Sequence, residues 1–489
     1  MTDAGISLAL AISAFVLDII IRVLAVVFVP KNRRPATATA WLLAIFFVPY
    51  AGGILFLLLG STRLSKRRRE RQQEINTFIL QATDGLEESR PSELPSSWMD
   101  SAVRLNRELG AMPLVGGNRA QLFGDYQRSI DEMTKLVESA TTFVHAQFYI
   151  LILDSTTAGF FAALEGAHRR GVTVRVLFDH FASLRTPGYH RTLRALTRSG
   201  IEWHRLLPLQ PWLGGYQRPD LRNHRKVLVV DGRVAFMGSQ NMVDRTYNKW
   251  RNRHRGLRWQ DIMVRLEGPI VAELNAIFIT DWYGETDVLL EREGSQTVAP
   301  MAPDSPLLNC QVVPSGPGFE GENNLRLFNT LIYAAQERVV LTSPYFVPDD
   351  SMLYAVTTAA QRGVQVELFV SEVGDQALVY HAQRSYYEAL LKAGVVIWLY
   401  RSPTILHAKH FTIDDEVAVV GSSNMDMRSF TLNLEVSLMV QGRSFVADLR
   451  QVQEGYRRAS RRLSLDEWQQ RPLRSAVLDN VARLTASVQ

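Results

Sequence analysis

The stretch from His224 to Asn241 reads H-R-K-V-L-V-V-D-G-R-V-A-F-M-G-S-Q-N, and it decides the fold of this chain. A second stretch, from His407 to Asn424, reads H-A-K-H-F-T-I-D-D-E-V-A-V-V-G-S-S-N. In both, Lys follows the His by two residues, Asp by seven, Gly-Ser by fourteen and Asn by seventeen. Six fixed positions at average composition have a probability on the order of 10⁻⁸ per starting point. The chain therefore contains an internal duplication.

Each stretch predicts a β-hairpin. In the first, the apolar run Val227–Val230 forms a strand, residues 231–232 (Asp-Gly) are a strong turn signal, and Val234–Met237 returns antiparallel. In the second, the turn falls at residues 414–415 and the return strand is Val417–Val420. Side chains two residues apart leave the same face of a strand. Each hairpin end is therefore expected to present an imidazole, an ammonium, a hydroxyl and an amide.

These four groups suit the chemistry of a phosphodiester. Ammonium and amide groups can hold the nonbridging oxygens, while an imidazole can attack phosphorus or protonate a leaving oxygen. One imidazole cannot easily do both at once, so the two motifs are predicted to form a single site. The predicted catalytic residues are His224, Lys226, Asp231, His407, Lys409 and Asp414, and the predicted phosphate-binding residues are Ser239, Asn241, Ser422 and Asn424.

The double H-x-K-x4-D-x6-G-S-x-N pattern resembles the phospholipase D superfamily, over nearly all of the chain after residue 100. The resemblance implies two similar α/β halves related by a pseudo-twofold axis, a phosphohistidine intermediate, and no metal. It also implies that His224 is the nucleophile and His407 the general acid. The residues alone are symmetric and leave that choice open.

The individual residues also have simpler explanations. A lone His on a strand usually packs or faces solvent, and a lone Lys is usually a solvated charge, but neither explains a paired repeat. Asp231 and Asp414 stand at turns, where Asp is common for local reasons, so a structural role is favoured for both although they belong to the signature. Asp261, in W-Q-D-I-M-V, and Glu435, in N-L-E-V-S-L, are predicted to orient the catalytic histidines, because an unpaired carboxylate beside an apolar strand is costly.

Composition sets the outer limits. With 489 residues, 46% of them hydrophobic, the chain is expected to form two or three domains with substantial cores. The net charge of +5 is small, but the basic residues are clustered. The single Cys310 excludes an intrachain disulfide and a cysteine-based metal cluster, and the ten His are not spaced as a ligand array. No metal or other cofactor is predicted.

Two hydrophobic segments, residues 6–29 and 36–60, are each long enough to span a bilayer, and the short connector Lys31–Pro35 makes them a predicted transmembrane hairpin. Asp18 and Arg22 lie four residues apart on one helix face and can neutralise each other. A secretory signal peptide is the alternative, but it requires a basic N-terminus, and the first basic residue here is Arg22.

The second hydrophobic segment contains helix-breaking residues. Pro49 and Gly52-Gly53 are predicted to kink it, and a re-entrant arrangement is also compatible with the pattern.

The basic residues around these segments predict their orientation. Six Lys or Arg lie between Arg63 and Arg71, against three in the connector. The positive-inside rule then puts both termini and the catalytic region in the cytoplasm, with the basic cluster against anionic headgroups. The pattern R-R-P…A-W-L-L…P…G…L-L-L-G resembles the membrane anchor of bacterial cardiolipin synthases.

Strands alternate with helices in both halves, which predicts an α/β fold made of two tandem α/β sandwich halves after the transmembrane hairpin. The predicted divisions are a hairpin at 1–62, a basic juxtamembrane segment and linker at 63–109, a first half at 110–285, a linker at 286–306, and a second half with a helical tail at 307–489.

Two further stretches have equally good structural and functional explanations. Leu206–Tyr216 is an apolar loop that either packs against the protein or enters the membrane interface. Arg245–Arg258 carries six Lys or Arg with Tyr247 and Trp250, and it is either a phosphate-binding segment or an ordinary solvated loop.

Three functions fit these observations. The resemblance implies a membrane-bound phosphatidyltransferase that makes cardiolipin and glycerol from two molecules of phosphatidylglycerol. A hydrolase, either a phospholipase D or a nuclease, uses the same chemistry with water as acceptor, and the residues do not distinguish water from an alcohol. A non-catalytic lipid-binding protein is disfavoured because both motifs are intact. The expected partners are phosphatidylglycerol and other anionic membrane lipids, with no nucleic acid.

Overall fold

The computed structural model describes residues 3–31, 33, 35–60, 74, 77, 97–208, 218–290, 306–319 and 321–485. These form two compact units, one from Met1 to Arg63 and one from Leu64 to Ser487. The basic cluster Arg63–Arg71, most of the two predicted linkers and residues 209–217 of the apolar loop lie outside the described residues.

The first unit is built on one long apolar helix, α1 (Asp3–Phe28). Its segment Leu10–Phe28 is, among the described residues, the one helix long and apolar enough to cross a membrane. Arg22 Nη2 lies 3.1 Å from Asp18 Oδ2, which confirms the predicted neutralisation of these two charges.

The second hydrophobic segment folds back on itself, as in the re-entrant arrangement that its sequence left open beside a single kinked helix. It consists of α2 (Pro35–Phe47) and α3 (Pro49–Leu59), broken at Val48 because Pro49 has no amide hydrogen to continue the helix. Arg33 links the start of α2 to the end of α3, because its Nη2 donates to the carbonyl oxygen of Gly60 at 2.9 Å. A Cβ atom on Gly52 would lie 2.6 Å from the Ala44 carbonyl oxygen, so glycine permits the close return of the chain.

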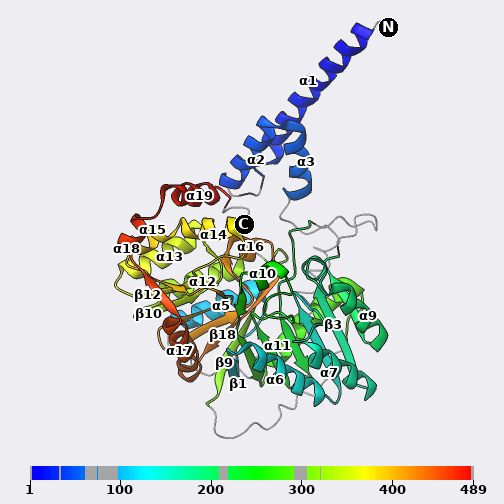
Figure 1. The fold of residues 1–489 in the computed structure, drawn as a ribbon, viewed down its shortest axis with the longest axis vertical. Coiled ribbons are helices and arrows are strands. Elements are labelled where there is room, and N and C mark those ends of the chain that lie inside the picture. Colours follow the sequence, from blue (N-terminus) through cyan, green and yellow to red (C-terminus); the bar gives the residue numbers. More distant parts are fainter. Residues whose placement is uncertain are drawn as a thin grey trace. The chain divides into compact units, whose positions relative to one another are not determined.

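The pair α2–α3 packs along the C-terminal part of α1. The Tyr50 hydroxyl, in the first turn of α3, donates to the carbonyl oxygen of Ala14 at 2.8 Å, and Gly53 packs against Ile21. Figure 1 shows α1 continuing beyond the bend between α2 and α3. The two short helices therefore start and finish near the same end of α1.

The second unit is organised around one continuous fifteen-stranded sheet, in the order β19-β13-β12-β10-β15-β16-β18-β9-β1-β8-β6-β5-β2-β3-β4. The strands from the first half are β1 (Val115–Phe123), β2 (Phe143–Phe148), β3 (Thr173–Asp179), β4 (Glu202–Leu206), β5 (Val227–Val230), β6 (Val234–Gly238) and β8 (Met263–Glu267). Those from the second half are β9 (Leu308–Ser315), β10 (Arg338–Thr342), β12 (Gln365–Ser371), β13 (Val396–Tyr400), β15 (His410–Ile413), β16 (Val417–Gly421), β18 (Glu435–Gln441) and β19 (Ser460–Leu463).

The strand order reads the same outward from the centre in both directions. β1 pairs antiparallel with β9 at the middle of the sheet. Beyond β1 come β8, the motif hairpin β6–β5 and the parallel strands β2, β3 and β4; beyond β9 come β18, the motif hairpin β16–β15 and the parallel strands β10, β12 and β13. This agrees with the predicted pseudo-twofold relation between the halves. The halves are nevertheless joined edge to edge, so their sheets form one structure.

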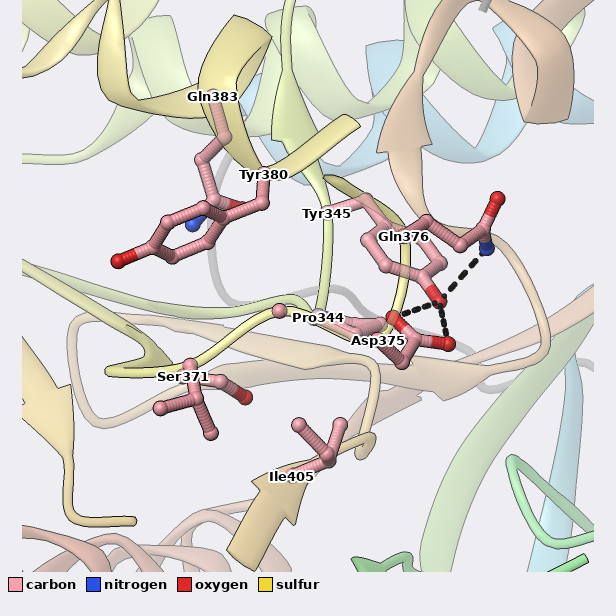
Figure 2. Close-up of a pocket in the computed structure, with 10 residues that line it drawn as sticks. Pro344, Tyr345, Ser371, Asp375, Gln376, Tyr380, Gln383 and Ile405 are labelled. Atoms are coloured by element: carbon pink, nitrogen blue, oxygen red, sulfur yellow. Dashed lines mark hydrogen bonds between the residues drawn. The ribbon is translucent and has the colours of Figure 1, made fainter. Parts of the chain in front are cut away.

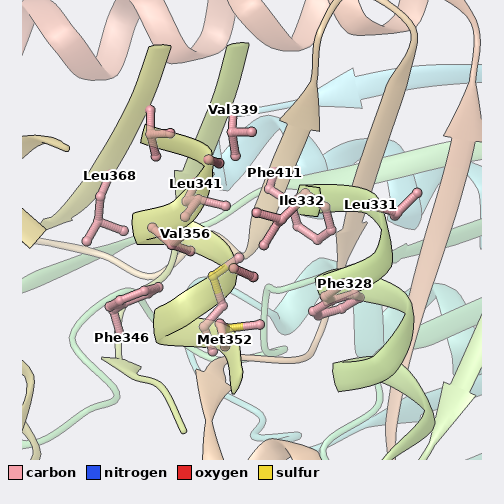
Figure 3. Close-up of a cluster of buried hydrophobic side chains, with 14 of the residues drawn as sticks. Phe328, Leu331, Ile332, Val339, Leu341, Phe346, Met352, Val356, Leu368 and Phe411 are labelled. Atoms are coloured by element: carbon pink, nitrogen blue, oxygen red, sulfur yellow. The ribbon is translucent and has the colours of Figure 1, made fainter. Parts of the chain in front are cut away.

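Helices cover both faces of the sheet. The first half contributes α6 (Tyr126–Glu138), α7 (Ala158–Arg169), α8 (His180–Leu184), α9 (Tyr189–Ser199), α10 (Trp250–His254) and α11 (Ile270–Thr286). The second contributes α12 (Asn323–Ala334), α13 (Asp350–Gln361), α14 (Ala377–Arg384), α15 (Tyr387–Lys392), α16 (Met427–Thr431), α17 (Arg443–Arg458), α18 (Leu465–Gln469) and α19 (Leu473–Arg483). Figure 3 shows the core of the second half, where Phe328 and Ile332 of α12 and Met352 and Val356 of α13 meet Leu341 of β10.

One predicted boundary is wrong. Residues 97–109 were assigned to the linker, but α5 (Ser97–Gly110) is a helix whose apolar side joins the core of the second half. Met99, Ala102 and Val103 recur at helical spacing and are almost fully buried there. The polar composition of the other side of α5 gives it the appearance of a linker in the sequence.

Both motif hairpins form as predicted. β5 pairs antiparallel with β6 in the register Val227 to Met237, and β15 pairs with β16 in the register His410 to Val420.

Candidate active site

The two motifs meet because the chain segments before each hairpin pair with the opposite half. β14 (Thr404–Leu406), directly before His407, pairs in parallel with β7 (Arg258–Gln260) of the first half. The His407 amide donates to the Gln260 carbonyl at 2.7 Å, and the His224 amide donates to the Leu434 carbonyl at 2.8 Å. Each motif histidine therefore sits beside the residue that precedes the other half's acid.

The side chains follow the same exchange. His224 Nδ1 lies 2.9 Å from Glu435 Oε2, and His407 Nδ1 lies 2.7 Å from Asp261 Oδ1. All four side chains are buried. With Nδ1 engaged by a carboxylate, each imidazole has Nε2 available for a substrate.

The motif lysines complete a small buried cluster. Lys226 and Lys409 each donate to the carbonyl oxygen of the histidine two residues earlier, in the second case at 2.5 Å. Lys226 Nζ also lies 5.2 Å from the ring centroid of Tyr149, whose edge contacts His224 at 4.6 Å between centroids.

The buried charges act on one another. Burial lowers the pKa of His224 well below its usual range, and the ammonium groups of Lys226 and Lys409 lower it further. Burial also lowers the pKa of Lys409 to about 8 and that of Lys226 well below its usual range. The effect of Lys409 on His224 follows from the proximity of the two motifs. An anion bound between these groups would favour the charged lysines.

The two carboxylates differ. Burial raises the pKa of Glu435 to about 7, although Lys226 opposes this. For Asp261, burial acts in the same direction, but His407 and Lys409 outweigh it, so its pKa is lowered. The pKa of His407 is lowered by burial and partly restored by Asp261. Asp261, beside His407, therefore stays ionised to a lower pH than Glu435, beside His224.

The motif serines bond to the two carboxylates that hold the histidines. Ser239 Oγ donates to Asp261 Oδ1 at 2.7 Å and accepts from the Ile262 amide. Ser422 Oγ makes the equivalent bond to Glu435 Oε2 at 2.5 Å. Both hydroxyls are fully buried and bond to the carboxylates, which favours support of Asp261 and Glu435 over the phosphate-binding role predicted for Ser239 and Ser422.

The motif asparagines differ between the halves. Asn241 accepts from the Ile150 amide at 3.2 Å and donates to the Tyr247 hydroxyl at 2.9 Å, so both ends of its amide have protein partners. Asn424 Oδ1 is buried and has no hydrogen-bond partner within the described part of the chain.

The motif aspartates lie at the other end of the hairpins. Asp231 accepts from the Thr141, Thr142 and Phe143 amides, and Asp414 accepts from three successive amides beginning at Gln336. Seven residues of extended chain, about 23 Å, separate each aspartate from its motif histidine. These contacts and this separation support the structural role favoured for Asp231 and Asp414 over a catalytic one.

Comparison with known proteins agrees with this geometry. The family profile described as "Cardiolipin synthase, PLD-like domain" matches residues 133–282 and 328–455, and the profile "Phospholipase_D-nuclease N-terminal" matches residues 18–61. "Cardiolipin synthase A" of Pectobacterium carotovorum subsp. carotovorum (strain PC1) is 34% identical over 459 residues, 92% of each chain. "Cardiolipin synthase A" of Proteus mirabilis (strain HI4320) is 33% identical over 465 residues, again 92% of each chain.

The chain belongs to the cardiolipin synthase family. This confirms the predicted resemblance to the phospholipase D superfamily. Among solved structures, the phosphatidylserine synthase of Haemophilus influenzae Rd KW20 matches with a TM-score of 0.57 at 16% identity, over 79% of this chain and 98% of that one. That likeness supports the fold.

A pocket adjoins the second motif of this cardiolipin synthase family member. It is lined by Ile405 of β14, two residues before His407, and by residues of β12 and α14. Figure 2 shows the Tyr345 phenol directed at Asp375, to which it donates at 2.9 Å, with Gln376 on the same hydroxyl. The position of Ile405 in both the pocket lining and β14 places this polar cluster next to the second motif.

The position equivalent to this pocket in the first half holds a buried ion pair that was not predicted. Asp179 lies 3.4 Å from Arg222 Nη1 and accepts from the Asn223 amide at 3.1 Å. In the second half, Ser371 takes the place of Asp179 and accepts from the Leu406 amide. Burial raises the pKa of Asp179 to about 6, against the effect of Arg222. The position of Asp179 at the end of the apolar strand R-V-L-F-D was the feature of the sequence that could have indicated this buried ion pair.

The two stretches left open can now be placed in part. Leu206 and Leu207 are buried, which favours packing for the described start of the apolar loop. In the basic stretch, Tyr247 is buried beside Asn241, whereas Trp250 of α10 is exposed. Across the described ranges, there is no group of three or more His, Cys, Asp or Glu arranged to hold a metal ion.

Proposed function

We propose that this member of the cardiolipin synthase family is a membrane-bound phosphatidyltransferase that converts two molecules of phosphatidylglycerol into cardiolipin and glycerol. The observation that carries the proposal is the pair of buried imidazoles, each held at Nδ1 by a carboxylate of the opposite half. Such a pair supplies a nucleophile and a proton donor to one phosphorus atom.

In the first step, His224 Nε2 attacks the phosphorus of one phosphatidylglycerol. The bond from phosphorus to the glycerol oxygen breaks, and that oxygen takes a proton from His407 Nε2. Lys226 and Lys409 balance the charge of the nonbridging oxygens, and the Asn424 amide nitrogen can donate a hydrogen bond to one of them. The assignment of roles is supported by the difference between the two histidines: burial lowers the pKa of His224 well below its usual range, so it carries a free electron pair at neutral pH, whereas Asp261 opposes the lowering at His407. Asp261 keeps its negative charge and stabilises a protonated His407.

In the second step, the terminal hydroxyl of another phosphatidylglycerol attacks the phosphorus of the phosphatidyl-histidine. His407 removes the hydroxyl proton, the phosphorus–nitrogen bond breaks, and His224 returns to its neutral form. One phosphodiester replaces another, so little bond energy changes and excess glycerol should reverse the reaction. The burial of the motif residues limits access of water to the intermediate.

We also propose a membrane topology with one span. α1 crosses the bilayer, and α2–α3 enters and leaves on one side. α2 has 13 residues and α3 has 11, so each rises only about 16–20 Å, short of the roughly 30 Å hydrocarbon core. The connector and the basic cluster Arg63–Arg71 then share the cytoplasmic side with the catalytic unit, which places all nine of their basic residues there. The N-terminus lies outside, in contrast to the first expectation.

Product analysis tests the reaction. Purified protein in phosphatidylglycerol vesicles should release glycerol and form cardiolipin in equal amounts, with little phosphatidic acid. Phosphatidic acid as the main product would identify a hydrolase and refute the transferase.

Two single substitutions test the shared site. His224→Ala and His407→Ala should each abolish turnover, because nucleophile and acid act as a unit. His254→Ala, at an exposed histidine of α10, is the matched control and should retain full activity. Half the activity remaining in each motif variant would indicate two independent sites.

A further inference from the structure

The C-terminal helix α19 presents an apolar face that no described part of the chain covers. Its exposed fractions are 79% for Leu473, 52% for Val477 and 57% for Val481, and Leu484 directly after it is 82% exposed. These positions follow helical spacing and form one stripe. Figure 1 shows α19 at the surface of its unit, next to α14. Contiguous exposed apolar surface on a soluble unit usually marks an interaction site.

The opposite face of α19 is firmly attached to the catalytic unit. Asp479 is fully buried and lies 2.7 Å from His381 Nδ1 and 3.2 Å from Arg384 Nε, both on α14. Arg384 Nη2 also donates to Ser475 Oγ at 2.8 Å. The helix is therefore held with its apolar stripe directed outward, because turning it inward would separate the Asp479 carboxylate from His381 and from the Arg384 guanidinium.

The charges around the stripe indicate its partner. Residues 471–485 contain three Arg and one Asp, and the Asp is the buried one, so the exposed charge of the segment is positive. Arg474 lies close to the apolar stripe on the helix wheel, where a long side chain can bury its stem and keep its head in the polar layer. An apolar stripe bordered by arginines is typical of a helix lying in the interface of an anionic bilayer.

We propose that α19 docks in the headgroup region of the anionic membrane to which α1 anchors the chain. The helix to which it is attached, α14, contributes Tyr380 and Gln383 to the pocket beside His407. Docking through α19 thus holds that pocket at a fixed distance from the lipid surface. A second copy of the chain is the competing partner. In a symmetric dimer the arginines beside the stripe would face one another and repel, so the anionic bilayer is the favoured partner.

Site-specific labels test the docking without relying on catalysis. Val477→Cys and Val481→Cys carry an environment-sensitive fluorophore in the full chain, reconstituted in vesicles that contain phosphatidylglycerol. The control is Lys135→Cys on α6, which is exposed and lies away from α19 in Figure 1. Native Cys310 is buried, and unlabelled wild-type protein checks that it does not react.

The expected result is quenching of both α19 labels by lipid-attached quenchers, at a depth of about 5–10 Å into the headgroup–acyl boundary, with no such quenching at position 135. Arg474→Gln with Arg483→Gln should weaken the effect, as should zwitterionic vesicles. Labels on α19 as exposed to aqueous quencher as the α6 label would overturn the proposal. So would disulfide formation between copies of Val477→Cys with unquenched labels, which would identify a self-contact. Neither outcome depends on whether the enzyme transfers phosphatidyl groups.

Discussion

At the scale of residues, the decisive feature is that each motif histidine depends on an acid from the other half. Glu435 binds His224 and is itself held by Ser422, while Asp261 binds His407 and is held by Ser239. The hydroxyls fix the carboxylates, and the carboxylates fix the tautomers of the imidazoles.

The pair of His224 and Glu435 gives a pH prediction. Because burial raises the pKa of Glu435 to about 7, its carboxylate is present above that pH and is lost as the pH falls through it. The carboxylate supports the attack by His224, so kcat should rise with pH through about 7. Glu435→Gln should lower kcat on the order of 10²-fold and flatten this limb. The measurement is kcat between pH 5 and 9. A rise of kcat with the same midpoint pH in Glu435→Gln would contradict the attribution of this rise to Glu435.

Ser239→Ala distinguishes support of a carboxylate from binding of a phosphate. Loss of one charge-assisted hydrogen bond, about 1.5–3 kcal/mol, should lower kcat about 10-fold or more with KM little changed. The measurement is vesicle kinetics over a range of phosphatidylglycerol surface concentrations. A raised KM with normal kcat would restore the original expectation that Ser239 holds the lipid phosphate.

The limits of sequence reasoning are clear at these residues. The spacing of the motif predicts that Ser239 returns beside His224, and the hairpin does bring it back. Its hydroxyl partner, however, depends on how β6 registers with β8, where Gly238 pairs with Met263 and brings Asp261 within reach. That register, and the exchange of acids between halves, depend on long-range packing that local periodicity does not encode.

At the scale of elements, the motif hairpins were predictable because their signals are local. Apolar runs and turn dipeptides specify Val227–Gly238 and His410–Gly421 without reference to the rest of the chain. The arrangement of the two short helices α2 and α3 was less predictable. Pro49 indicates a break in the helix, but the return of the chain also involves the long-range contact between Arg33 and Gly60. α5 was missed because its polar side resembles the preceding linker and its apolar side packs against a core formed by residues far along the sequence.

The turn aspartates give a stability prediction with an internal control. Asp414→Ala removes an acceptor of three backbone amides and should cost about 2–3 kcal/mol, with kcat of the folded enzyme unchanged. Asp415→Ala, one residue further on, removes only an exposed ion pair with Arg450 and should cost under about 1 kcal/mol. The midpoints of thermal unfolding in detergent measure both. Equal shifts in the two variants, or a catalytic defect in Asp414→Ala without a shift, would argue against a purely structural role.

At the scale of the whole molecule, the membrane topology can be tested with single cysteines. Lys31→Cys, in a Cys310→Ser background, should react with an impermeant thiol reagent only after cell lysis, because the proposed topology places the connector and the catalytic unit on the cytoplasmic side. Arg104→Cys on α5 should behave in the same way. An epitope tag at the N-terminus should be detected on intact cells. Reaction of Lys31→Cys from outside would instead establish two spans.

The single sheet that joins the halves has a genetic consequence. A cell carrying two alleles, one with His224→Ala and one with His407→Ala, makes chains whose lesions lie in different repeats. Each chain keeps one competent imidazole, but β1 and β9 hold its own halves together, so neither can lend its intact repeat to the other. The two alleles should therefore fail to complement each other, and the two repeats should behave as a single complementation group.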